Sequence, residues 1–234
     1  MPPAFGDTTA MSTLFDAIRQ GDAERVRTLL AADPKLAGAR TADGASPALW
    51  AVYTRHPELA ATVLAGREPD FFEACALGNR GRASALLAAD PKLVDSYSGD
   101  GFTPLGLAIF FGHEELARQL VAAGADVNRP SRNAIRVAPL HSAVASGSVA
   151  LVRLLLEHGA RPDDVEFLEA TPLHSAAACG NREMAERLLS AGADAQRKTK
   201  DGKTAAGLAR EHGYEPLAEW LANYSASPLG SEGK

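Results

Sequence analysis

The chain has 234 residues, a formal net charge of −5 and a pI near 5.7, with lysine and arginine scattered along its length. This charge balance argues against nucleic acid as a partner, because nucleic-acid binding requires a clustered basic surface. No apolar run approaches the roughly 20 residues that cross a bilayer, and the first residues lack the basic and apolar parts of a signal peptide. With only two cysteines, which do not suggest a disulfide framework, we expect a soluble cytoplasmic protein.

Both ends of the sequence are small, polar and rich in Pro and Gly, so we expect flexible tails at residues 1–11 and 223–234. Between them, residues 12–222 are predicted to form one domain of seven repeated units. The units start at about residues 12, 46, 69, 103, 138, 171 and 204. The second unit is shortened, because only 23 positions separate its start from that of the third, whereas the other spacings are 33 to 35.

Three columns of the alignment support these units. Alanine stands five residues into every unit, from Ala17 to Ala209, and an aliphatic residue stands seventeen residues in. Glycine stands nine residues in, except in the second unit, where Arg55 replaces it. A small residue allows helices to approach closely, and glycine ends a helix in the left-handed conformation. Each unit is therefore predicted to be two short helices joined by a turn and followed by a loop.

The segment Thr171–Ala176 reads TPLHSA, and Pro139–Ala143 repeats most of it. This motif and the period of about 33 residues resemble the ankyrin repeat. The resemblance covers residues 12–222 and implies an all-α solenoid of helix-turn-helix units with short β-hairpin loops. It implies a non-enzymatic module, a scaffold for protein–protein interaction, that binds another protein through a concave groove. It also implies a structural role for His141 and His174, which occupy the same motif position.

The string AADPKL occurs at residues 31–36 and again at residues 88–93, an offset of 57 positions. In both places it follows the second helix of a unit, and the residue before proline is driven out of the helical region, so Asp-Pro should end that helix without glycine. The offset indicates that units one and two were duplicated together as units three and four. Because the second unit is short, one projecting loop should be missing, which would leave a gap between units two and three.

Groove-facing positions of the units form the candidate partner-binding surface. Aromatic residues cluster there in the fourth unit, and aromatic anchors carry most of the binding energy in protein interfaces. The rings of Phe110 and Phe111 could instead pack against neighbouring helices. Three arginines near the fifth unit could form a rim for acidic side chains, or their charges could simply be solvated. The candidate residues are Tyr53, Leu77, Phe102, Phe110, Phe111, Arg129, Arg132, Ile135, Arg136, Val137 and Phe167.

The sequence contains no phosphate-binding loop, hydrolase elbow or zinc-protease motif, so we assign no catalytic residue, metal ligand or cofactor. A monomer is expected. One alternative function is a small-ligand or hydrolytic site at the notch between units two and three, where Arg67, Glu68, Asp70 and Glu73 cluster. A closed pocket with converging carboxylates would favour that alternative, and an open surface would not.

Overall fold

The computed structural model describes residues 8–166 and 168–224, and these contain fourteen α-helices and two short 3-10 helices. The α-helices follow one another as seven pairs. The pairs are α1 (Thr8–Arg19) with α2 (Ala23–Ala32), α3 (Pro47–Tyr53) with α4 (Pro57–Val63), α5 (Phe71–Ala76) with α6 (Arg80–Ala89), α7 (Pro104–Phe110) with α8 (Glu114–Ala122), α9 (Pro139–Ala145) with α10 (Val149–Glu157), α11 (Pro172–Ala178) with α12 (Arg182–Ser190), and α13 (Ala205–Glu211) with α14 (Glu215–Ala222).

The 3-10 helices η1 (Pro34–Gly38) and η2 (Pro91–Asp95) follow α2 and α6, where the AADPKL string recurs. In both copies the aspartate caps the new helix, with Asp33 Oδ1 accepting from the Lys35 amide and Asp90 Oδ1 from the Lys92 amide. Helix α1 begins at Thr8, so residues 8–11, assigned to a tail from the sequence, belong to a helix.

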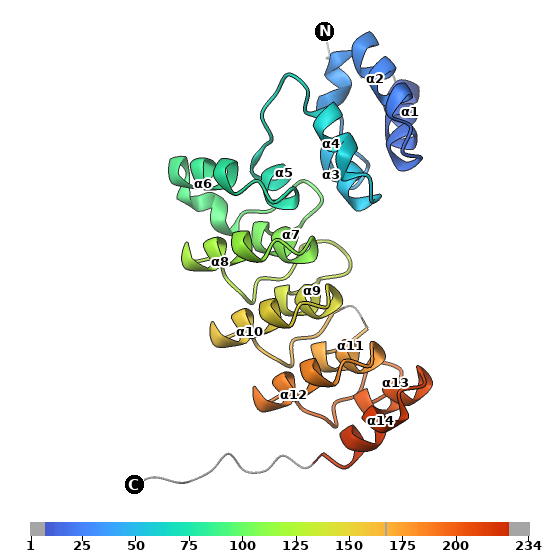
Figure 1. The fold of residues 1–234 in the computed structure, drawn as a ribbon, viewed down its shortest axis with the longest axis vertical. Helices are drawn as coiled ribbons and strands as arrows, with labels where there is room; N and C mark the ends of the chain where they lie inside the picture. The colour runs from blue at the N-terminus through green and yellow to red at the C-terminus, as the bar shows by residue number, and fades with distance from the viewer. Residues whose placement is uncertain (1–7, 167, 225–234) are drawn as a thin grey trace.

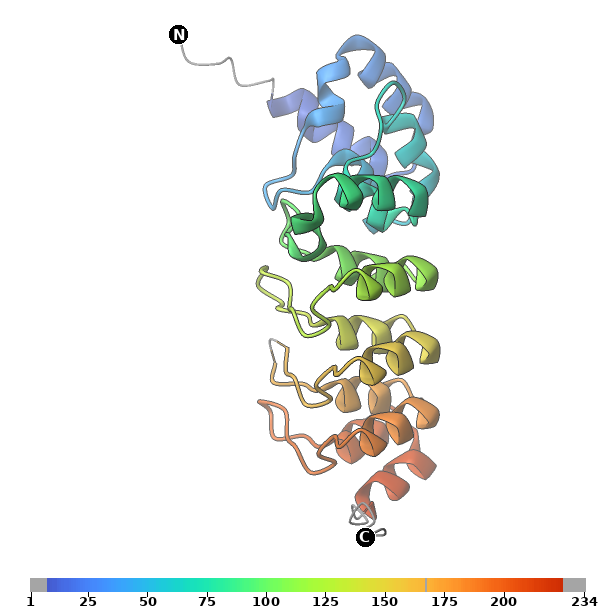
Figure 2. The ribbon, with the colours of Figure 1, turned by 90° about the vertical axis from the view of Figure 1, so that its left-hand side faces the viewer.

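The pairs from α5/α6 to α13/α14 stack in a column, and the loops between pairs project from one side of it (Figure 1, Figure 2). The alanine column explains the close stacking, since all seven alanines from Ala17 to Ala209 are fully buried, with 0% exposure. No larger side chain occupies these positions between the first helices. The predicted all-α solenoid of helix-turn-helix units is confirmed.

The first helix of most pairs begins with a side chain that caps its free amides. Ser46 Oγ accepts a hydrogen bond from the Leu49 amide, and Thr103 Oγ1 accepts one from the Gly106 amide. These contacts satisfy donors that have no partner inside the helix. In several units proline follows the cap, where a missing amide proton costs nothing.

The glycine column ends the first helices as predicted. The six glycines, from Gly21 to Gly213, have φ between 68° and 82°, in the left-handed region. Arg55 stands in the same column and also has a positive φ, of 66°. The backbone of the second unit therefore follows the other units, although a residue with a Cβ must adopt the strained conformation.

We expect Arg55→Gly to stabilise the protein by about 0.5–1 kcal/mol. Glycine removes the strain of the left-handed conformation, and this gain exceeds the free energy lost because glycine makes the unfolded chain more flexible. Chemical denaturation measures the change. The matched control is Gly112→Ala, since a Cβ there meets no atom within 4 Å and tests the backbone alone. That control should lose about 1 kcal/mol. If Arg55→Gly is no more stable than wild type, the backbone at Arg55 is not strained.

The projecting loops, which we call the finger loops, are turns, since the described part of the chain contains no strand. This differs in detail from the expected β-hairpins. Each finger loop is closed by one backbone hydrogen bond at its base, and neighbouring finger loops are also joined, as by the Arg132 amide and the Gly101 carbonyl at 2.8 Å. The closing bonds run from Thr41 to Ala45, Ser98 to Phe102, Ser131 to Val137, Glu166 to Ala170 and Thr199 to Lys203.

Helices α4 and α5 are connected by residues 64–70 without a finger loop, in line with the short second unit. The expected gap is nevertheless absent from this region, because the flanking finger loops close up. Their backbones touch so closely at Gly44 and Gly99 that a Cβ on Gly44 would collide with the Gly99 carbonyl. The expectation of a gap was therefore wrong. Helices α1–α4 instead lie to one side of the column formed by the later pairs (Figure 1).

The hydrophobic core is divided at this junction. One cluster of buried side chains comes from α1–α4 and Leu36 in η1. The other comes from α5 to α14 and includes Ala45 and Leu49 from the N-terminal part. Phe111 is half-buried and packs against both clusters. The junction between α4 and α5 is thus a seam between two core clusters, and Leu49 and Phe111 are among the side chains that cross it.

Candidate partner-binding site

An aromatic row crosses the seam and contains four of the predicted site residues. The ring centroids are 6.1 Å apart for Phe102 and Tyr53, 5.6 Å for Tyr53 and Phe111, and 5.1 Å for Phe111 and Phe110. Such spacings are typical of favourable aromatic contacts. Tyr53 belongs to the second unit, Phe110 and Phe111 belong to the fourth, and Phe102 lies at the end of the finger loop just before the fourth unit. Helix α3 therefore contacts the fourth unit directly.

The two adjacent phenylalanines have different surroundings. Phe110 is 51% exposed at the end of α7, whereas Phe111 is half-buried between the two core clusters. The sequence left open whether these rings bind a partner or pack against neighbouring helices. In the structure Phe111 packs across the seam, and Phe110 is free to contact a partner.

The hydroxyl of Tyr53 fixes the aromatic row to a finger loop. It donates a 2.7 Å hydrogen bond to Asp100 Oδ2, and the Ser98 hydroxyl donates to Asp100 Oδ1. Burial of Tyr53, together with the nearby Asp100 carboxylate, raises the pKa of the phenol above its ordinary value. Tyr53 therefore stays protonated and acts as a hydrogen-bond donor to Asp100.

A groove of about 830 Å³ lies beside this row, between α3 and three finger loops. Aromatic side chains supply much of its wall, and Arg132 and Asp43 are charged residues along it. It brings together four predicted residues, Tyr53, Phe102, Arg132 and Ile135, and two that were not predicted, Trp50 and Tyr97.

Trp50 and Tyr97 line the groove, and each is held by a hydrogen bond to an adjacent unit. The Trp50 indole donates to the Phe15 carbonyl at 3.1 Å, and the Tyr97 hydroxyl donates to the Pro130 carbonyl at 3.2 Å. Trp50 lies one helical turn before Tyr53 on α3, so both side chains lie on the same face of the helix and line the groove. This spacing is the signal that would have identified Trp50 from the sequence.

The arginines predicted to form a rim divide into two groups. Arg129 is held in place by Asp95 at 3.8 Å, by Asp126 at 3.9 Å and by a bond to the Asp95 carbonyl. Arg132 and Arg136 are exposed on the finger loop that runs from Ser131 to Val137. Arg129 thus links loops within the fold, whereas the other two are available to a partner.

The remaining candidates lie apart from the groove. Leu77 and Phe111 line a smaller cavity of about 400 Å³ next to Arg55 and His113. Val137 is half-buried, and its amide donates to Ser131 Oγ at the base of the finger loop. Phe167 lies outside the described residues.

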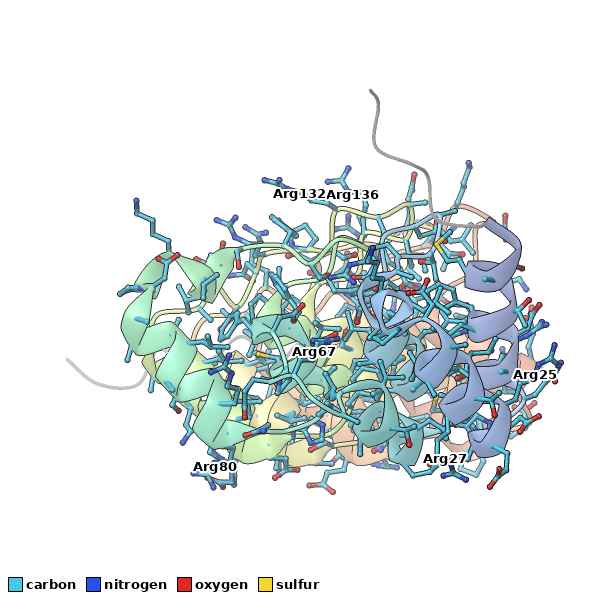
Figure 3. The ribbon with its side chains drawn as sticks, turned by 90° about the horizontal axis from the view of Figure 1, so that it is seen from above. Arg25, Arg27, Arg67, Arg80, Arg132 and Arg136 are labelled. Atoms are coloured by element: carbon cyan, nitrogen blue, oxygen red, sulfur yellow. The ribbon has the colours of Figure 1, made fainter. Side chains whose placement is uncertain are left out.

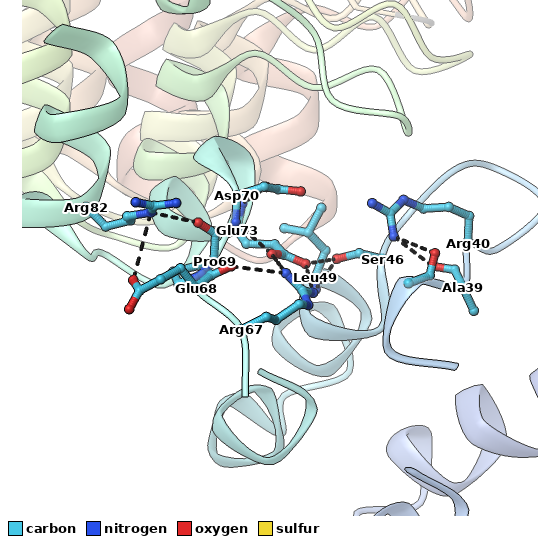
Figure 4. A network of polar contacts seen from close by, with 11 residues as sticks. Ala39, Arg40, Ser46, Leu49, Arg67, Glu68, Pro69, Asp70, Glu73 and Arg82 are labelled. Carbon is cyan, nitrogen blue, oxygen red and sulfur yellow. Dashed lines mark hydrogen bonds and ion pairs between the residues drawn. The ribbon is translucent and has the colours of Figure 1, made fainter. Parts of the chain in front are cut away.

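The polar cluster at the notch is a closed network and not an open site (Figure 4). Arg67 donates two 2.7 Å bonds to the Glu73 carboxylate, which also accepts from the Ser46 hydroxyl and the Asp70 amide. Asp70 caps α5 by accepting from the Glu73 amide. Glu68 is exposed and lies 3.9 Å from Arg82.

The pKa of Glu73 agrees with a carboxylate whose two oxygens are both hydrogen-bonded. Burial alone would raise the pKa of the Glu73 carboxyl, but the hydrogen bonds from Arg67, Asp70 and Ser46 hold it below the ordinary value. The carboxylate is therefore ionised, 1% exposed and fully engaged. It has no free oxygen to activate water or bind a ligand, so the alternative function at the notch loses its basis. Within the ranges described, no group of three or more His, Cys, Asp or Glu side chains is placed to hold a metal ion.

His141 and His174 link the ends of first helices to the neighbouring loops. His174 Nε2 lies 3.1 Å from the carbonyls of Arg197 and Lys203, and its Nδ1 lies 2.8 Å from the Thr171 hydroxyl. His141 Nε2 contacts the Ala170 carbonyl at 3.1 Å, but its buried Nδ1 has no partner. The difference arises because alanine occupies position 138, where the sixth unit has threonine.

We expect Ala138→Thr to stabilise the protein by about 1 kcal/mol, since a hydroxyl there can cap α9 and reach His141 Nδ1. The backbone supports this, because Ala138 has the same φ and ψ, −81° and 155°, as the capping residue Thr103. Denaturation of Ala138→Thr against Ala138→Val, which has the shape but no hydroxyl, isolates the hydrogen bond. Equal stability of both variants would contradict it.

These features define a helical repeat protein whose finger loops project from a stack of helix pairs. A family model described as "Ankyrin repeats (3 copies)" matches residues 71–166 and 140–230, so the chain belongs to the ankyrin repeat family. Ankyrin repeats are a general protein–protein interaction module. The match begins at the first residue of α5, the point where the core divides.

Several named relatives resemble parts of the chain. It is 42% identical to the ankyrin repeat protein nuc-2 of Neurospora crassa over 77 residues, or 33% of this chain and 7% of that protein. It is 35% identical to the mouse ankyrin repeat and SAM domain-containing protein 6 over 94 residues, or 40% and 10%. It is 52% identical to the mouse ankyrin repeat and SOCS box protein 16 over 50 residues, or 21% and 11%. Each match thus covers only a small part of the relative.

Proposed function

We propose that this chain is a non-enzymatic module that binds a protein partner through the face formed by its finger loops and first helices. One observation carries the proposal. Of the five large apolar side chains that are exposed in the described residues, four lie on this face, and the fifth, Tyr214, directly precedes α14. The four are Phe110, Ile135, Val165 and Leu168. Exposed apolar groups that gather on one face are characteristic of interaction surfaces.

The groove beside the aromatic row supports the same surface. Its wall contains aromatic side chains, which supply large contact areas in interfaces. Phe110 is the best candidate for an anchor, because it is half-exposed while its neighbour Phe111 supports it edge-on. We further propose action in the cytoplasm as a monomer, which fits the unpaired thiols of Cys75 and Cys179. None of the helices in residues 8–224, residue 167 aside, is long and apolar enough to cross a membrane.

The experiment is affinity capture from the native cell with wild type, Phe110→Ala and the control Tyr214→Ala. Loss of an anchor costs on the order of 2 kcal/mol, or about 30-fold in affinity, so Phe110→Ala should lose the partner that the wild type retains. Tyr214→Ala, which removes an exposed aromatic ring elsewhere, should retain it. Melting curves of all three proteins separate a binding defect from unfolding. Retention of every partner by a folded Phe110→Ala protein would refute this surface.

A further inference from the structure

The finger loop from Ser131 to Val137 is larger than its neighbours and has side-chain hydrogen bonds of its own. Its closing hydrogen bond spans six residues, whereas each of the other finger loops spans four. The Asn133 carboxamide oxygen accepts from the Ser131 hydroxyl at 2.8 Å and from the amides of Ile135 and Arg136 at 3.3 and 3.4 Å. This internal bonding holds the tip in one shape, which reduces the entropy lost on binding.

Two arginines on this loop are exposed and have no ion pair within the described residues. Most arginines of the chain lie within 4.0 Å of a carboxylate, as Arg129 does, and carboxylates are in excess in a chain of net charge −5. Arg132 and Arg136 instead lie together at one edge of the molecule, opposite Arg80 (Figure 3). The Arg132 guanidinium lies 4.0 Å from the centre of the Tyr97 ring, a cation–π contact that positions its charge.

The groove beside the loop has an apolar wall and opposite charges at its two sides. Ile135, which is 52% exposed, lies on it with Tyr53 and Phe102. Arg132 lines the loop side, while Asp43, exposed and without an ion pair among the residues placed in the structure, lines the finger loop of the first unit. Asp100 also lines the groove, but it is buried and accepts hydrogen bonds from Tyr53 and Ser98. A ligand with negative charge is therefore attracted at Arg132 and repelled at the exposed Asp43.

We propose that the loop from Ser131 to Val137 binds an acidic segment of a partner protein. An apolar side chain of that segment enters the groove beside Ile135, and carboxylates next to it in sequence contact Arg132 and Arg136. Carboxylates suit these residues, because a guanidinium offers parallel donors in a planar fork. Asp43 confines the acidic residues to one end of the segment. This inference rests on the proposed function and adds the chemistry of the partner.

The test is selection of a phage-displayed random peptide library on the immobilised full chain and on the double variant Arg132→Glu/Arg136→Glu. Wild type should enrich peptides with an apolar residue beside Asp or Glu, and the variant should enrich peptides in which Lys or Arg replaces the acidic residues. The matched control is Arg25→Glu/Arg80→Glu, which makes the same charge change at two other exposed arginines that have no ion pair in the described ranges. It should select the same acidic peptides as wild type.

Binding of one enriched peptide, measured by fluorescence anisotropy, gives the magnitude. The Arg132→Glu/Arg136→Glu protein should bind it at least about tenfold more weakly, because two attractive rim charges become repulsive. The difference should shrink as salt is raised. Asp43→Asn should bind the same peptide a few-fold more tightly.

Three outcomes would overturn the inference: no acidic preference, a preference that the charge reversal leaves unchanged, or failure to select any peptide. A peptide whose binding depends on Phe110 but not on the two arginines would overturn the inference and leave the proposed function standing. The proposed function fails separately, when a folded Phe110→Ala protein keeps its native partners.

Discussion

Replacement of Arg67 by alanine is expected to destabilise the protein by about 3 kcal/mol at neutral pH, the low end of the range for breaking a buried ion pair. The Glu73 side chain is 0% exposed, so it would remain buried without its cation. We take the low end because Arg67 itself is 33% exposed. Chemical denaturation measures the loss.

The control for this prediction is Arg82→Ala in the same region. Arg82 is 32% exposed and has only a 3.9 Å pair with the exposed Glu68 and one bond to the Pro69 carbonyl, so its loss should cost about 1 kcal/mol. In the Arg67→Ala background, Glu73→Gln should restore part of the stability by removing the buried charge. Equal losses for Arg67→Ala and Arg82→Ala would show that the network contributes no more than a surface pair.

The pH dependence of the Arg67 effect has a definite sign. Because the pKa of folded Glu73 lies below its ordinary value, about 4.3, its contribution to stability is present above that pH. It is lost as the pH falls through the folded pKa. The stability difference between wild type and Arg67→Ala should therefore be largest at neutral pH and shrink below about pH 4.

Phe111→Ala is expected to cost about 2 kcal/mol, less than the 3–5 kcal/mol of a fully buried phenylalanine because the ring is half-buried. The lost contacts are those that join the two core clusters across the seam, since Phe111 packs against both clusters and lies 5.6 Å from the Tyr53 ring. Thermal unfolding followed by tryptophan fluorescence should show the part containing Trp50 melting earlier. The adjacent Phe110→Ala should cost under about 0.5 kcal/mol, as an exposed residue does. Equal costs for both variants would contradict the bridging role of Phe111.

Much of the fold could be predicted from the sequence because the repeated positions have direct physical causes. The alanine column is fully buried, and every position in the glycine column has positive φ. Arg55 also has a positive φ, so this position needs the left-handed conformation even where the residue is not glycine. The structural role implied for His174 agrees with its contacts, since its Nε2 lies 3.1 Å from the carbonyls of Arg197 and Lys203 in the neighbouring loop.

The arrangement at the second unit could not be predicted in the same way. A repeat pattern fixes what each unit is, but the rotation between units depends on the connector and on the interface, neither of which recurs elsewhere in the chain. As a result the finger loops at Gly44 and Gly99 meet where a gap was expected. Phe111 is packed instead of free for the same reason, because α3 lies against the fourth unit.

The divided core also determines how the molecule should respond to stress. Units in a repeat array are held by their own packing and by contact with nearest neighbours, so the array yields first at its weakest interface. Here that interface combines a charged network with the aromatic row and the buried Leu49, and Phe111 packs against both core clusters. Heat or mechanical tension should therefore detach residues 8–63 as a block while the later helix pairs remain assembled. A partner that binds Tyr53 and Ile135 at the same time would contact both residues 8–63 and the later helix pairs. Such binding would raise the force needed to separate these two parts.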